Sequence, residues 1–212
     1  RHYQPAQRTV VPERLVGFGR RRNSLAKDVL IAVDQLGSMA DSIVYASVHA
    51  AVLARIPALR TRLLAFDTSV TDLSDVLHDP VDVLFGVQLG GGTDIAAALE
   101  VCRRSIARPA DTVLVLISDL FEGGDPDAMR RVVATLVRSG VTVVAMVALS
   151  DEGAPSFDHA AASDLAALGA SVLACTPDRF PDVLAAALDG RPIGVEPAAT
   201  TPAAPPGAWS VR

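Results

Sequence analysis

Residues 29–33 form a short apolar run with no polar face, and the run stops at a carboxylate, Asp34. A strand of this kind is buried on both sides, as strands are in parallel sheets, whereas a half-exposed strand alternates apolar and polar residues. Gly37 and Ser38 follow, and a helical pattern then extends from residue 39 to about residue 56. The order of strand, polar turn and helix predicts that the turn carries the function.

Apolar strands and helical patterns alternate along the rest of the chain. This alternation implies right-handed crossovers, so the sequence predicts an α/β fold with a doubly wound, mostly parallel, Rossmann-like sheet and helices on both faces. Residues 72–88 are ambiguous, because 73–77 fit a helical turn and 81–87 fit a short extended piece. The further strands are predicted at 61–66, 112–117, 141–148 and 171–175, and the further helices at 95–107, 125–139, 158–168 and 180–188.

The length and composition of the chain predict one main domain. Half of its 212 residues are hydrophobic, which is enough for one substantial core, placed here at residues 25–190. Residues 1–24 are predicted to form a basic surface strap. Residues 191–212 are rich in proline and alanine, which is typical of a linker or a disordered tail.

Charge and hydropathy argue against two classes of partner. The net charge is −5, and the basic run at residues 20–22 lacks the interleaved aromatic residues of a nucleic-acid platform. No apolar run approaches the ~18–20 residues that cross a bilayer, so we expect a soluble protein without membrane contact.

Cys102 and Cys175 are predicted to be buried free thiols, which fits a reducing, cytoplasmic compartment.

Two carboxylates follow two of the predicted strands. In doubly wound sheets, ligands bind outside the carboxyl ends of the strands, where the strand order reverses. If the reversal lies between the first strand and the strand at 112–117, Asp34 and Asp119 face one crevice. Ser38 then opens the helix beside them, and a glycine loop delivers Thr93.

The residue types in this set point to a metal. Taken singly, each residue is more commonly a helix cap or a turn residue. Together, carboxylates and hydroxyls without histidine or cysteine are hard oxygen ligands, which suit Mg²⁺, Ca²⁺ or Mn²⁺. A cation also removes the repulsion between two carboxylates that are held close together.

Residues 34–38, Asp-Gln-Leu-Gly-Ser, resemble the Asp-x-Ser-x-Ser signature of von Willebrand factor A (VWA) domains. In that family a later threonine and an aspartate after the fourth strand complete a metal-ion-dependent adhesion site (MIDAS). Thr93 in Gly-Gly-Thr-Asp and Asp119 in Ile-Ser-Asp match these positions. The resemblance covers roughly residues 28–188 and implies a six-stranded sheet between helices.

The resemblance also implies a function. A divalent cation at Asp34, Ser38, Thr93 and Asp119 would keep one position open for an aspartate or glutamate of a partner protein. Bacterial proteins of this kind often work beside MoxR-type AAA ATPases, which makes such an ATPase the expected partner. The predicted function is therefore a non-catalytic, cation-dependent protein-interaction module.

One position departs from the family pattern. Leu36 stands where the family has the first serine, whose hydroxyl binds the metal directly. Leucine offers no lone pair, and Mg²⁺ requires nearly octahedral oxygen coordination, so binding should be weak or absent, with Ca²⁺ or Mn²⁺ better tolerated. The alternative is accordingly a metal-free scaffold in which Leu36 disables the site.

Asp94 and Glu122 could supply further oxygen ligands at the rim of this site, although a solvated acidic loop is the competing role.

A metal-dependent hydrolase is the third hypothesis. A haloacid-dehalogenase-type phosphatase needs a second aspartate where Leu36 stands, and a serine hydrolase needs a nucleophile elbow with a histidine base. The glycines at 90–92 are not followed by the Gly-Lys-Ser/Thr of a phosphate-binding loop. The sequence therefore favours a protein that is not an enzyme.

Overall fold

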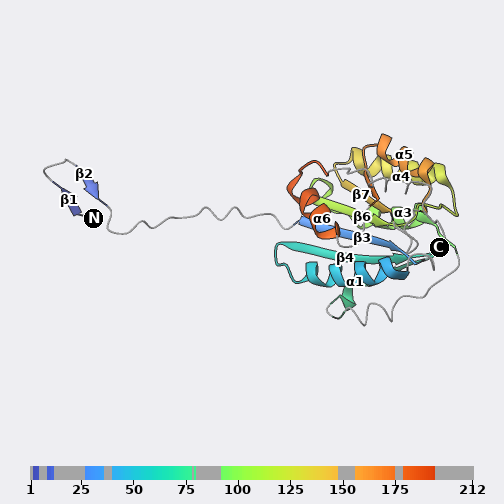
Figure 1. Ribbon diagram of the computed structural model, residues 1–212, viewed down its shortest axis with the longest axis horizontal. Helices are drawn as coiled ribbons and strands as arrows, with labels where there is room; N and C mark the ends of the chain where they lie inside the picture. Colours follow the sequence, from blue (N-terminus) through green and yellow to red (C-terminus); the bar gives the residue numbers. More distant parts are fainter. Residues whose placement is uncertain are drawn as a thin grey trace, which may run out of the picture.

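The strand that the sequence singles out, β3 (Lys27–Asp34), lies inside a six-stranded sheet (Figure 1). The last six of its eight residues are buried, as expected for a strand that is covered on both faces. This computed structural model describes residues 2–4, 9–11, 27–35, 40–77, 79, 92–147, 156–174 and 179–193.

The sheet has the strand order β5-β4-β3-β6-β7-β8. Every neighbouring pair is parallel except β4 with β5, which is antiparallel. The predicted doubly wound, mostly parallel sheet is thus confirmed. Its other strands are β4 (Leu59–Phe66), β5 (Val70–Asp72), β6 (Thr112–Ile117), β7 (Thr142–Val147) and β8 (Ser171–Ala174).

The edge strand β5 lies where the sequence analysis predicted no strand. Asp67 shapes the turn before it, since its Oδ1 accepts hydrogen bonds from the backbone N–H and the hydroxyl of Ser69 at 2.6 and 2.9 Å. The chain then pairs back onto β4 for three residues, which is too short a strand to show a period of two. A 3₁₀ turn, η2 (Ser74–Val76), follows within the ambiguous region, and residues 81–87 lie outside the described part.

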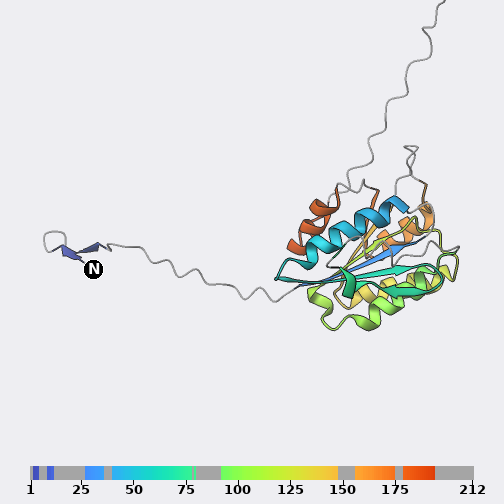
Figure 2. The same cartoon turned by 90° about the horizontal axis from the view of Figure 1, so that it is seen from below.

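Helices cover both faces of the sheet, as predicted. One apolar cluster joins one face to α3 (Ile95–Ser105), α4 (Pro126–Arg138) and α5 (His159–Ala167). The other cluster joins the opposite face to α1 (Ala40–Ala54) and α6 (Phe180–Asp189). Figure 2 shows α1 and α6 together on one side of the sheet and α3 on the other.

Three of these helices begin at an aspartate that caps them. The side chains of Asp94, Asp125 and Asp158 accept backbone N–H groups in the first turns of α3, α4 and α5, respectively. Such caps satisfy donors that have no partner within the helix.

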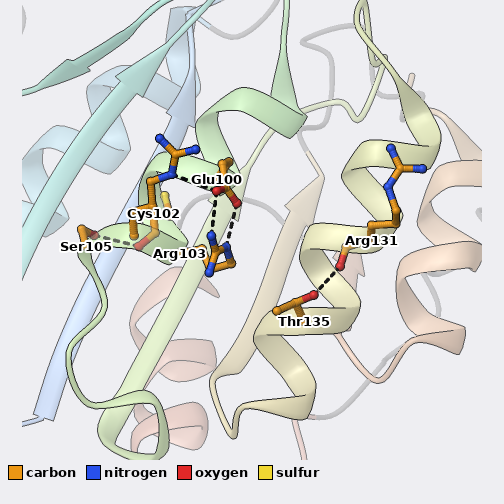
Figure 3. Close-up of polar contacts among 7 residues, drawn as sticks. Glu100, Cys102, Arg103, Ser105, Arg131 and Thr135 are labelled. Carbon is orange, nitrogen blue, oxygen red and sulfur yellow. Dashed lines mark hydrogen bonds and ion pairs between the residues drawn. The ribbon is translucent and has the colours of Figure 1, made fainter.

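Polar contacts on the outer surface of α3 and α4 follow helical spacing (Figure 3). Glu100 accepts hydrogen bonds from Arg103 and Arg104, at 2.7 and 2.9 Å.

Cys102, on the inner side of α3, is fully buried, and burial raises the pKa of its thiol to about 12. The prediction of a buried thiol is confirmed for Cys102, whereas Cys175 lies outside the described residues.

The two ends of the chain lie outside the main sheet or outside the described residues. β1 (His2–Gln4) and β2 (Thr9–Val11) pair as a small antiparallel sheet within the predicted basic strap. Residues 194–212, most of the predicted tail, lie outside the described part. No helix among the described residues has the length and apolar character needed to traverse a membrane.

Candidate functional site

The winding of the chain reverses beside β3. The chain passes from β3 to β4 on one side and returns later to β6 on the other, so the reversal lies between β3 and β6. Val33 of β3 pairs with Ile117 of β6, so Asp34, the last residue of β3, and Asp119, two residues after β6, lie at the carboxyl ends of two neighbouring strands. These ends form the edge at which ligands bind in sheets of this type.

Asp34 is fully buried, and two hydroxyls from distant parts of the chain contact its carboxylate. Ser118 Oγ donates to Asp34 Oδ2 at 2.9 Å, and Thr93 Oγ1 donates to Oδ1 at 3.4 Å. Ser118 and Thr93 are also buried, with 0% and 5% of their surface exposed. The structure thus brings together Asp34 and Thr93, two of the predicted site residues.

Backbone hydrogen bonds on both sides hold Thr93 in place. The N–H of Asp94 donates to the carbonyl of Asp67 after β4 at 2.8 Å, and the N–H of Gly123 donates to the carbonyl of Thr93 at 2.9 Å. A Cβ atom on Gly123 would lie only 2.6 Å from that carbonyl oxygen, so only glycine permits this approach. Gly92 precedes Thr93 with a φ of 136°, which side chains rarely adopt.

Side chains within the loop after β6 fix its shape. Ser118 Oγ accepts the N–H of Leu120 at 3.0 Å, and Asp119 Oδ1 accepts the N–H of Phe121 at 3.2 Å. The carbonyl of Asp119 accepts the N–H of Asp158, the cap of α5. Leu120 has a φ of 63°, which is unusual for a residue with a side chain, and that side chain is completely buried.

Ser118 belongs to this candidate site, and the sequence analysis did not single it out. The available signal was its position directly after an apolar strand, beside Asp119 and opposite the end of β3. A hydroxyl at that point is also common in ordinary turns, so the sequence alone did not distinguish the two roles.

The two predicted rim residues hold the backbone in place. Asp94 caps α3 through the N–H of Ala97 at 2.8 Å. Glu122 accepts the N–H of Ala96 at 3.1 Å and the N–H of Gly124 at 2.7 Å, which ties the loop after β6 to the first turn of α3. Partial burial raises the pKa of the Glu122 carboxyl above its usual 4.5, although these N–H donors oppose the rise.

The predicted metal ligand Ser38 and the departing motif position Leu36 lie outside the described residues. Their neighbour Gln35 is buried, and its N–H donates to the carbonyl of Phe66 at 2.8 Å. In the described part of the chain, no cluster of three or more histidine, cysteine or acidic side chains is placed to hold a metal ion. The polar atoms at Asp34 are its own carboxylate oxygens and the hydroxyl oxygens of Thr93 and Ser118.

Comparison with known proteins decides the family. The model of the family described as "VWA domain containing CoxE-like protein" matches residues 2–184. This chain belongs to that family. The VWA fold inferred from the sequence motifs is therefore confirmed, and the VWA domain occupies most of the chain.

A curated relative agrees with this assignment. The VWA chain is 42% identical over 165 residues to the uncharacterized protein YehP of Escherichia coli (strain K12), covering 78% of this chain and 44% of the relative. The chain thus spans less than half of the length of that relative.

Among solved structures, the VWA chain resembles an aerotolerance-related membrane protein from Bacteroides fragilis NCTC 9343. The TM-score is 0.57 at 14% identity, over 77% of this chain and 99% of the other. The SpRpn10 VWA domain gives a TM-score of 0.52 at 11% identity, over 80% and 97% of the two chains. At these identities the comparisons show a shared fold.

Proposed function

We propose that this VWA domain is a non-catalytic interaction module that binds a carboxylate of a partner protein through a divalent cation. The observation that supports the proposal is the meeting of Asp34, Thr93 and Ser118 at the edge of the sheet where the winding reverses. Two hydroxyls from two other segments of the chain converge on one buried carboxylate there. This is the environment that hard cations prefer.

The described oxygen ligands fit such a cation, because they are carboxylates and a hydroxyl. Asp34, Thr93 and Asp119 are described, and with Ser38 they are the residues that would hold the ion. The ion would supply a positive centre, short of negative ligands, that attracts a carboxylate of the partner. The hydrogen bonds around Thr93 and Asp119 keep these side chains in position before any partner arrives.

A metal-free scaffold is the second candidate, and Leu36 is the observation that favours it. Leucine removes one hydroxyl from the family's ligand set. The hydroxyls of Thr93 and Ser118 already hydrogen-bond the Asp34 carboxylate, so the buried group has partners without an ion. In this version the domain would bind its partner through another surface.

Thermal unfolding with and without millimolar Mg²⁺, Ca²⁺ or Mn²⁺ tests the proposal in the chain as it is and in Leu36→Ser. A ligand at a hundred times its dissociation constant adds about 2.7 kcal/mol to the free energy of unfolding. A shift in both proteins supports the cation-dependent module. A shift in Leu36→Ser alone favours the metal-free scaffold, and no shift in either protein defeats the metal proposal.

The partner class and the location are proposed with the same module. From the sequence resemblance we infer a MoxR-type AAA ATPase as the partner, in the bacterial cytoplasm. The chain is expected to co-purify with such an ATPase. Co-purification should depend on added cation and should be lost in Thr93→Val.

Turnover of a generic phosphate or ester substrate that disappears in Asp34→Ala would instead support the hydrolase hypothesis.

A further inference from the structure

The outer face of α1 carries most of the exposed apolar side chains of the described chain. Seven large hydrophobic residues are exposed among the described residues, and five of them belong to α1 or to the turn that follows it, with exposed fractions of 40% to 57%. We call these five residues the α1 stripe: Val44, Tyr45, Val48, Val52 and Ile56.

The inner face of α1 is apolar as well. Ile43, Ala46 and Ala50 are buried against the sheet, and His49 stacks on Phe180 of α6 with ring centroids 4.8 Å apart. The helix lies on the outside of the domain in Figure 2, beside α6. A helix that is apolar on all sides is typically covered on all sides, whereas α1 leaves its outer face to solvent.

The charges of this helix lie only at its two ends. Residues 42–54 contain no aspartate, glutamate, lysine or arginine, whereas Asp41 lies in the first turn and Arg55 directly follows the last. Both are seven residues from Val48, so positions 41, 48 and 55 share one line along the helix. The arrangement is therefore symmetric about Val48 in position and opposite in charge.

We propose that the α1 stripe binds a second copy of this chain, with the two α1 helices antiparallel about a two-fold axis at Val48. A two-fold contact places each residue opposite its counterpart at the same distance from the axis. The Asp41 end of one helix then lies against the Arg55 end of the other, at both ends of the pair. The antiparallel order also brings opposite ends of the helix dipoles together.

A second copy fits this surface better than a charged partner does. A self-contact through the middle of the helix brings no like charges together, because that part of the stripe is uncharged. The largest apolar patch of a monomer is typically about 300–600 Å², and a contact between two patches of that size buries roughly 600–1,200 Å², at the lower end of specific interfaces. A contact made by the α1 stripe alone is therefore expected to give a weak, reversible dimer.

Sedimentation equilibrium of the full chain over about 1–500 μM tests this interface, with spectroscopic confirmation that each variant is folded. The expected result is a monomer–dimer equilibrium that Val48→Asp abolishes, because the substitution places two carboxylates at the axis. Val101→Asp is the matched control: Val101 is 40% exposed, on α3 at the opposite face, and its replacement should leave the equilibrium unchanged.

A charge exchange tests the antiparallel order. Arg55→Asp alone should weaken the dimer several-fold, because it sets residue 55 against Asp41 of the other copy. Adding Asp41→Arg should restore it, since opposite charges then face each other again. A chain that stays monomeric at every concentration, a dimer that Val48→Asp leaves intact, or a double exchange that fails to restore association would overturn the proposal. The first outcome would mean that another segment of the chain or another protein covers the stripe.

Discussion

Ser118 Oγ donates a 2.9 Å hydrogen bond to Asp34 Oδ2, and both residues are completely buried although 84 residues separate them. The same hydroxyl accepts the N–H of Leu120 at 3.0 Å. One side chain thus links the ends of β3 and β6 and also shapes the loop that contains Asp119. A buried hydroxyl with two such partners contributes to stability whether or not a cation binds.

Ser118→Ala is therefore expected to lower the free energy of unfolding by about 1–3 kcal/mol, because it leaves a buried N–H and a buried carboxylate oxygen without this partner. Urea unfolding at neutral pH measures the change. Ser69→Ala is the control, because Ser69 also contacts an aspartate but on the exposed surface, and its effect should stay within about 0.5 kcal/mol. Equal effects of the two substitutions would contradict the role of Ser118.

Gly123→Ala is expected to disturb the position of Thr93. The new Cβ would start 2.6 Å from the Thr93 carbonyl oxygen, so the loop or the threonine must move, at about 1–3 kcal/mol in unfolding free energy. The backbone N–H of residue 123 donates to that carbonyl, and its hydrogen exchange should become faster in the variant.

Gly190→Ala provides the comparison for Gly123. Its Cβ would meet nothing within 4 Å, but its φ of 65° is strained for alanine. This variant should lose about 1 kcal/mol without faster exchange at Gly123. An unchanged exchange rate in Gly123→Ala would show that Thr93 does not depend on the close approach.

Glu122 should make the stability depend on pH in a defined direction. Burial raises the pKa of its carboxyl above 4.5 in the folded chain, so the folded state binds its proton more tightly than the unfolded state. This contribution favours folding below pH 4.5 and is lost as the pH rises through the folded pKa. The unfolding free energy of the chain, relative to Glu122→Gln, should therefore fall as the pH rises from 4.5. A rise in that difference would refute the assignment.

Cys102 should be chemically inert in the folded chain. It is fully buried, and its pKa of about 12 leaves almost no thiolate at neutral pH. In a Cys175→Ser variant, a thiol reagent at pH 8 should react with Cys102 only after denaturant unfolds the domain. Rapid reaction under native conditions would show that α3 detaches readily from the sheet.

The central part of the fold could be predicted because the buried strands are long and uniformly apolar. β3 and β6 have the continuous hydrophobic runs that parallel sheets require, and the carboxylates that follow them indicate the functional edge. The edge strand β5 escaped prediction because a three-residue strand has no measurable period. Its pairing depends on the turn at Asp67, which is a local hydrogen-bond arrangement.

The candidate site was only partly predictable, since the polar residues around it have two kinds of role. Asp34 and Thr93 meet as the sequence pattern suggests. Glu122 and Asp94 have the same chemistry, yet their carboxylates bind backbone N–H groups. Sequence spacing does not reveal which oxygens the backbone will occupy, because that choice depends on the path of the loop in three dimensions.

The unusual backbone of Leu120 has a consequence for how changes in the core reach the candidate site. Its side chain belongs to the same apolar cluster as Met129 and Leu165, of α4 and α5, while its backbone separates Asp119 from Phe121. The packing of this side chain in the core thus fixes the loop that contains Asp119. A glycine at this position would relax the backbone and remove the buried side chain, so we expect the orientation of Asp119 to depend on packing in the hydrophobic interior.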